Sequence, residues 1–228
     1  YHNDMKQSIY DYIQSRADEF IDISDKIWEY AELSLNEYKS VACYLDFLKK
    51  EGFNVREKAA NVPTAFVATY GEGRPRIGIL AEYDALSSLS QKPGVAHKVP
   101  LVPGGHGHGC GHNLLGAGSL AAAVAVKKLI EDGKLSGTVV FYGCPGEEGG
   151  AGKAFMAKEG IWYGLDAAIT WHPFDVNEVS VGSCNSCIQV LYKYKGVASH
   201  AAGDPEHGRS ALDAVELMNV GVQYLREH

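Results

Sequence analysis

The chain contains the stretch Gly105-His106-Gly107-His108-Gly109-Cys110-Gly111-His112-Asn113, in which three imidazoles and one thiol fall within seven residues. Only glycines separate these side chains. Because glycine adds no bulk and tolerates positive φ angles, the backbone can bend tightly and direct the side chains at one point. A Cys-x-His pair in such a loop suits zinc, or manganese when carboxylates complete the coordination shell. The stretch therefore predicts a metal site, provided that further ligands lie elsewhere in the sequence.

A predicted strand at residues 76–81 is followed by two acids. Its apolar run Ile77-Gly78-Ile79-Leu80 is typical of a strand that is buried on both faces, and Glu82 and Asp84 come directly after it. Open α/β sheets bind ligands at the carboxyl ends of their strands. Asp84 is therefore a candidate site residue. The alternative is an ordinary turn or helix-cap acid, and this alternative has more weight for Glu82.

Two further predicted strands end in the same kind of residue. The strand at 137–142 leads to Glu147 and Glu148, and the strand at 167–171 leads to His172. Adjacent carboxylates disfavour each other's ionisation, but a metal ion removes this conflict if one acid binds it and the other stays nearby as a base. Surface acids are the alternative. The repetition of ligand-type residues after three strands predicts that one metal site lies at this edge of the sheet.

The remaining pattern predicts an α/β fold, with helices on both faces of a sheet. Apolar spacings and turn signals place these elements: helices over 4–31, 37–51, 114–131 and 210–227, and strands over 53–56, 64–70 and 183–195. Residues 34–37 offer an N-terminal cap for the second helix. The long connection over 87–109 delivers the histidine and cysteine cluster, so we interpret it as functional.

Composition disfavours several function classes. The formal net charge of -7 leaves no basic stripe to neutralise phosphates, so we expect no nucleic-acid partner. We expect no membrane span, because no stretch approaches the ~20 apolar residues that one needs. Five cysteines and no recognisable signal peptide predict free thiols and a cytoplasmic protein. Cys184 and Cys187 form a C-x-x-C pair inside a predicted strand, where a redox or zinc role is disfavoured.

The order of the motifs resembles the dinuclear-metal amidohydrolases related to aminoacylase and carboxypeptidase G. An acid-x-Asp-Ala-Leu segment is followed by His-x-Cys-Gly-His, Glu-Glu-Gly-Gly, a histidine and Gly-x-x-Ser-His-Ala-Ala. Residues 107–116 and 208–219 are similar to the p-aminobenzoyl-glutamate hydrolase B-subunit group, within the branch of amino-acid-conjugate hydrolases. The resemblance begins near residue 27 and continues to the end of the sequence.

This resemblance implies a zinc-exopeptidase-like catalytic domain over residues 1–183. Residues 184–228 would form the first strand and helix of a smaller α+β lid or dimerisation domain. The resemblance also implies two divalent metal ions, Mn²⁺ or Zn²⁺, with these ligands: Cys110, His112, Glu148 and His172. Glu147 would be the general base, Asp84 would orient a metal ligand, and His200 would polarise the scissile carbonyl.

Two departures from the family pattern bear on this ligand set. Asn113 stands where the family has an aspartate, so one carboxylate near the metal site becomes neutral. The family's last metal-binding histidine lies further downstream than this sequence extends. We therefore expect the chain to be part of a protein of roughly 400 or more residues, as the family and usual domain sizes suggest.

The resemblance predicts a metal-dependent amidohydrolase that cleaves an N-acyl amino acid, with p-aminobenzoyl-glutamate as the first expected substrate. A homodimer, or a heterodimer with a sister subunit, would form through the lid domain. Three alternatives stay open. The protein could be a dipeptidase or aminoacylase for another N-acyl amino acid, or a non-catalytic partner subunit. It could also be a cysteine hydrolase that uses Cys110 as nucleophile and His108 or His112 as base.

Overall fold

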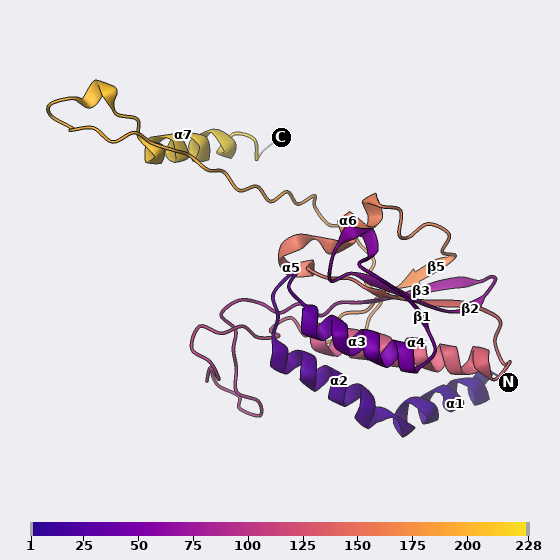
Figure 1. Ribbon diagram of the computed structural model, residues 1–228. Helices are drawn as coiled ribbons and strands as arrows, with labels where there is room; N and C mark the ends of the chain where they lie inside the picture. Colours follow the sequence, from indigo (N-terminus) through magenta and orange to yellow (C-terminus); the bar gives the residue numbers. More distant parts are fainter. Residues whose placement is uncertain (1, 227–228) are drawn as a thin grey trace. The chain divides into compact units, whose positions relative to one another are not determined.

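The computed structural model describes residues 2–226. The chain divides into two compact units, Tyr1–Asn177 and Glu178–His228, and the elements of both are drawn in Figure 1. The division expected from the sequence lies slightly later, between residues 183 and 184. That the second unit belongs to a lid or dimerisation domain stays a prediction.

A five-stranded sheet forms the centre of the first unit, with the strand order β1-β2-β4-β3-β5. Its strands are β1 (Asn54–Glu57), β2 (Phe66–Glu72), β3 (Arg76–Ala81), β4 (Gly137–Gly143) and β5 (Ala167–Ile169). β2 pairs antiparallel with β1 and with β4, whereas β3 runs parallel to both β4 and β5. In this register Ile79 lies opposite both Phe141 and Ile169. The carboxyl ends of three parallel strands therefore meet at one edge.

Helices cover both faces of this sheet, which confirms the predicted fold class (Figure 1). On one face lie α2 (Ala17–Tyr30), α3 (Tyr38–Lys50) and α4 (His112–Glu131), with α1 (His2–Ser15) against α4. Their apolar side chains form the larger core, around residues such as Tyr44 and Phe141. On the other face, Met156 of α6 (Gly152–Lys158) packs in a smaller core with Val140 and Tyr142. The short helices α5 (Glu147–Gly150) and η1 (Ala59–Asn61) complete this unit.

The single helix predicted over residues 4–31 is wrong, because the chain breaks between α1 and α2 at Arg16. The backbone of Arg16 has φ -117° and ψ 14°, outside the helical range. Its guanidinium pairs with Glu19 at 2.8 Å and also with Glu51 at the end of α3. The ion pairs join the residue at the break to α2 and to the end of α3.

The cap predicted for α3 also differs. No side chain of residues 34–37 caps this helix; Glu37 occupies the N-cap position without a capping hydrogen bond. The carboxylate of Glu32 instead accepts hydrogen bonds from the N–H groups of Lys39 and Ser40, at 2.9 and 2.8 Å. Glu32, which lies outside the helix, thereby accepts hydrogen bonds from two backbone N–H groups of the first turn that have no partner within the helix.

α4 is longer and more apolar than the sequence analysis allows. It has 20 residues, and an 18-residue window of it has a mean hydropathy of 1.3, which is sufficient by length and composition for a membrane span. The expectation that no stretch reaches this limit is therefore wrong. Because 67% of that window is buried inside the protein, α4 has the character of a core helix, and such helices pass the same test.

The second unit contains η2 (Pro205–His207) and α7 (Ala211–Gln223). The predicted last helix is confirmed, and the Ser210 side chain caps it by accepting a hydrogen bond from the Asp213 N–H. The strand predicted over 183–195 does not appear in the described part of the chain. Its alternating apolar residues are exposed, among them Ile188 at 84%. A strand needs a pairing partner for its backbone groups, and this segment has none among the described residues.

Candidate metal centre

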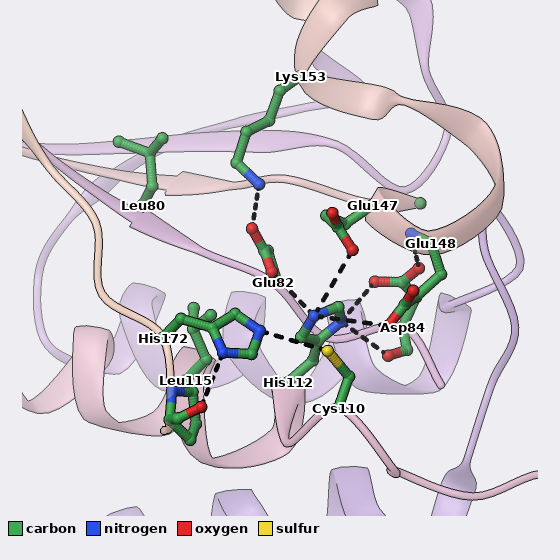
Figure 2. A network of polar contacts seen from close by, with 12 residues as sticks. Leu80, Glu82, Asp84, Cys110, His112, Leu115, Glu147, Glu148, Lys153 and His172 are labelled. Carbon is green, nitrogen blue, oxygen red and sulfur yellow. Dashed lines mark hydrogen bonds and ion pairs between the residues drawn. The ribbon is translucent and has the colours of Figure 1, made fainter. Parts of the chain in front are cut away.

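Acidic, imidazole and thiol side chains gather at the carboxyl edge of the three parallel strands (Figure 2). They come from four segments: Glu82 and Asp84 after β3, Cys110 and His112 at the start of α4, Glu147 and Glu148 in α5 after β4, and His172 after β5. Gly111 has a φ of 80°, so it turns the chain sharply between Cys110 and His112 and lets both side chains reach the site. The structure thus brings together every candidate residue that the sequence placed at a strand end.

His112 is the central residue of the cluster and is fully buried. Its Nδ1 lies 2.9 Å from Asp84 Oδ1 and 3.0 Å from the Asp84 carbonyl oxygen. Because both neighbours accept hydrogen bonds, Nδ1 carries a proton. Nε2 faces Glu82 Oε2 at 3.0 Å, with Glu147 at 3.7 Å and Glu148 at 3.9 Å. Nε2 has no hydrogen-bond partner among the described residues, so it is placed to bind a cation.

Asp84 supports this arrangement with both of its oxygens. While Oδ1 contacts His112, Oδ2 accepts hydrogen bonds from the Ser34 hydroxyl at 2.7 Å and from the Glu148 N–H at 2.9 Å. Burial alone would raise the pKa of Asp84, but these donors lower it below its ordinary value. The carboxylate is therefore ionised and fixes the imidazole of His112. An outer carboxylate commonly orients a metal-bound histidine in this way.

A second group of donor atoms is formed by Cys110, His112 and His172, which lie within 4.8 Å of one another. Cys110 Sγ is 3.3 Å from His172 Nε2. His172 Nδ1 donates to the Pro173 carbonyl oxygen at 2.9 Å, so in the neutral ring Nε2 has a free lone pair that faces the thiol. One sulfur and two imidazole nitrogens form a donor set typical of zinc.

The charges around Cys110 do not resemble those around an activated cysteine nucleophile. Burial raises the pKa of the Cys110 thiol to about 12, and the neighbouring carboxylates, first Glu148, contribute to the shift. Nucleophilic cysteines have a lowered pKa in electropositive surroundings. His108 is no base for this thiol, because its Nε2 contacts the Ile27 carbonyl oxygen at 3.0 Å and burial lowers its pKa to about 4.

Glu147 and Glu82 have opposite electrostatic surroundings. Burial raises the pKa of Glu147, and the charges of Glu82 and Glu148 raise it further. Burial would also raise the pKa of Glu82, but the nearby His112 and Lys153 lower it below its ordinary value. Burial would lower the pKa of His112, whereas its contacts with Asp84 and Glu82 raise it to about 10. The cluster therefore attracts positive charge strongly, and a divalent metal ion fits the donors and charges present.

The sequence analysis missed residues that support the site from the segment between α2 and α3. Ser34 donates to Asp84 and accepts a hydrogen bond from the Gly149 N–H at 2.9 Å. Glu37 is fully buried and accepts a hydrogen bond from the Gly146 N–H at 2.7 Å. Both hold the turn that carries Glu147 and Glu148. The only signal in the sequence is an acid, Glu37, at the start of an otherwise apolar helix face.

His200 lies in the second unit, where its own loop fixes the state of its ring. Its Nδ1 accepts hydrogen bonds from the N–H groups of Ala202 at 3.2 Å and Gly203 at 2.9 Å. When the ring is neutral, the proton must therefore lie on Nε2. This nitrogen can donate a hydrogen bond to another molecule, which is what the predicted role of His200 requires.

Comparison with known proteins gives a consistent result. Residues 78–222 match the peptidase family M20/M25/M40. The chain is 48% identical over 222 residues to the B subunit of p-aminobenzoyl-glutamate hydrolase from Escherichia coli (strain K12), covering 96% of this chain and 45% of that protein. It is 30% identical over 236 residues to Xaa-Arg dipeptidase of Homo sapiens, covering 94% of this chain and 49% of that protein. The chain spans about half the length of these curated relatives.

Solved structures agree with these matches. The Bacillus subtilis YXEP protein, a dinuclear metal binding peptidase from the M20 family, superposes on this chain with a TM-score of 0.57 at 26% sequence identity. The superposition covers 68% of this chain and 42% of that chain. Together with the sequence matches, it confirms the resemblance that the motifs indicate.

Proposed function

The chain belongs to the peptidase family M20/M25/M40, and we propose that it forms the metal-binding part of an amidohydrolase that cleaves the amide bond of an N-acyl amino acid. The observation that carries the proposal is the buried Nε2 of His112, which faces three carboxylates and has no hydrogen-bond partner within the described residues. An amide carbon is a poor electrophile and water is a poor nucleophile, and a cation at such a place can activate both.

The proposed centre holds two divalent metal ions, Mn²⁺ or Zn²⁺, through these ligands: Cys110, His112, Glu148 and His172. Their sulfur, nitrogen and oxygen atoms form a mixed donor set that suits either metal. When bound, the ions lower the pKa of a water molecule and polarise the substrate carbonyl. Asp84 holds the His112 ring through Nδ1 and so keeps Nε2 directed at the site.

Glu147 would transfer the proton, and His200 would stabilise the negative charge that develops on the substrate. Glu147 takes a proton from the attacking water and later delivers it to the leaving amine, a task that suits a carboxylate whose pKa is raised. His200 donates a hydrogen bond from Nε2 to the oxyanion that develops on the substrate. In other enzymes the loss of one oxyanion donor costs ~2.7–4 kcal/mol of transition-state stabilisation.

The first substrate we propose is p-aminobenzoyl-glutamate, because the chain is similar to the B subunit of the Escherichia coli p-aminobenzoyl-glutamate hydrolase. That relative is named as a subunit, which supports a heterodimer with a sister subunit, and a homodimer is the alternative. We propose that the contact forms through the domain that begins in residues 184–228, and that the protein is cytoplasmic.

A dipeptidase is the second candidate, and the likeness to Xaa-Arg dipeptidase supports it. A substrate panel of p-aminobenzoyl-glutamate, N-acetyl amino acids and Xaa-Arg dipeptides separates the two. The highest kcat/KM for p-aminobenzoyl-glutamate would support the first candidate. The highest value for a dipeptide would move the assignment to the second.

Chelation tests the chemistry itself. The full-length protein should lose hydrolysis of its best panel substrate in a chelator and regain it when Mn²⁺ or Zn²⁺ is added. A cysteine hydrolase would keep its activity in the chelator and lose it only on thiol alkylation. If the protein binds metal but hydrolyses nothing on the panel, alone or with a sister subunit, the proposal fails and a non-catalytic role in assembly replaces it.

A further inference from the structure

Glu82 is a buried acid that the proposed mechanism does not use. It follows β3 directly and is only 7% exposed. Its carboxylate points into the cluster between His112 and Lys153 (Figure 2). Oε1 pairs with the Lys153 ammonium of α6. Oε2 has no hydrogen-bond partner among the residues that the structure covers, although it is buried. A buried carboxylate oxygen without a partner is costly, so this atom requires an explanation.

Oε2 of Glu82 faces a second buried atom of the same kind. It lies 3.0 Å from Nε2 of His112, and neither atom has a hydrogen-bond partner within residues 2–226. The pair is close but lacks hydrogen-bond geometry. In the neutral His112 ring, whose proton lies on Nδ1, Nε2 presents a lone pair to the carboxylate oxygen, so the two atoms repel each other unless a positive charge lies beside both. A proton on Nε2 would need to lie along the line to Oε2, whereas a metal ion can bind the two atoms side by side.

The carboxylate of Glu147, the proposed base, lies beside this pair. Glu147, His112 and Glu82 offer ligand atoms that all lie within 4.8 Å of one another. This group is distinct in composition from the sulfur- and imidazole-containing group of Cys110 and His172, and it shares only His112 with it. With Glu147 left free as the base, the Glu82 carboxylate and the His112 imidazole are harder donors than the sulfur-containing group, and such donors suit Mn²⁺.

We propose that Glu82 is a further ligand of the metal centre, binding through Oε2 while Lys153 holds Oε1. This inference rests on the proposed function only in that it requires the centre to bind metal. Lys153 fixes one oxygen and leaves the other directed at the site. The carboxylate is thereby held in position before the metal binds, as a well-supported ligand should be.

Co²⁺ titration of the full-length protein tests this assignment, because visible Co²⁺ absorption bands report the ligands directly. The metal-free wild-type protein is compared with Glu82→Gln, Glu82→Asp and Lys153→Met, after circular dichroism has shown that each variant folds. Glu82→Gln should bind one Co²⁺ ion at least tenfold more weakly and shift the absorption bands. Glu82→Asp should partly restore the bands. Lys153→Met breaks the same ion pair but keeps the carboxylate, so it should shift the bands less than Glu82→Gln does.

Three results would overturn the inference. Glu82→Gln could weaken Co²⁺ binding and leave the bands unchanged, which would show a through-space charge effect only. Glu82→Gln and Lys153→Met could change the bands equally, which would show a structural need for the ion pair. A wild-type protein that binds no Co²⁺ would exclude any metal ligand. A wild-type protein that binds Co²⁺ but hydrolyses nothing would contradict the proposed function alone, and the comparison of variants would still decide the role of Glu82.

Discussion

Glu147 is the residue whose replacement separates catalysis from metal binding. Glu147→Gln keeps the size of the side chain but removes its ability to accept a proton. Because general acid–base catalysis contributes ~10²–10⁴-fold, we expect kcat to fall by about that factor while the metal content stays at the wild-type level. Hydrolysis rates and metal analysis of the same preparation measure both quantities.

The matched control is Glu159→Gln, which makes the same change on an exposed residue at the end of α6. It should leave both the rate and the metal content unchanged. Wild-type turnover by Glu147→Gln would show that another group takes the proton.

At the residue scale, the ligand-type residues of the site can be predicted from the sequence more readily than the residues that hold them in position. Donor-type residues after three buried strands indicate one cluster, because parallel strands bring their carboxyl ends to one edge. The structure places these residues together, while their individual roles stay predictions. Ser34 and Glu37 could not be identified in this way. Their partners in the site, Asp84, Gly149 and Gly146, lie 50, 115 and 109 residues further along the chain, and only the folded structure brings such pairs together.

Among the elements, α3 offers a direct test of its cap. Glu32→Ala removes the acceptor for the N–H groups of Lys39 and Ser40. The loss of a helix cap costs ~0.5–2 kcal/mol, so we expect the free energy of unfolding in urea to fall by about that amount. Asn36→Ala, in the segment from which the sequence predicts the cap, should change it little. If Asn36→Ala proved the more damaging variant, the assignment of the cap to Glu32 would be wrong.

The end of β2 provides a second test at this scale, with a control two residues away. Gly71 and Gly73 both have positive φ angles, 89° and 74°. A Cβ atom at Gly71 would lie 2.3 Å from the Gly137 carbonyl oxygen, whereas a Cβ at Gly73 would meet nothing within 4 Å. Since overpacking costs ~1–3 kcal/mol, Gly71→Ala should be less stable than Gly73→Ala by about that amount in thermal or urea unfolding. Equal stabilities would contradict the close approach of β2 and β4.

Sequence patterns predict an element best when the residues of that segment alone determine its structure. Residues 76–81 form β3 with the predicted bounds, because an apolar run identifies a strand buried on both faces. Apolar spacing does not report the break at Arg16, where the backbone leaves the helical range. Residues 183–195 have the alternation of a strand, but a strand also needs a partner. The apolar pattern of one segment does not show whether a pairing strand lies beside it.

At the scale of the whole molecule, the three parallel strands explain why one edge carries the site. Each strand delivers ligand-type residues to the same place, and the buried α4 begins there with Cys110 and His112 just at its start. The chain spans about half the length of its curated relatives. Experiments on the full-length form therefore test the proposed activity.

The most direct test of this proposal is the release of p-aminobenzoate from p-aminobenzoyl-glutamate by the full-length protein. The protein is first stripped of metal with a chelator, and Mn²⁺ is then added back. We predict no release from the metal-free protein and restored release with Mn²⁺. Release that continues at the same rate without any bound metal would contradict the central claim that the cluster around His112 is a catalytic metal centre.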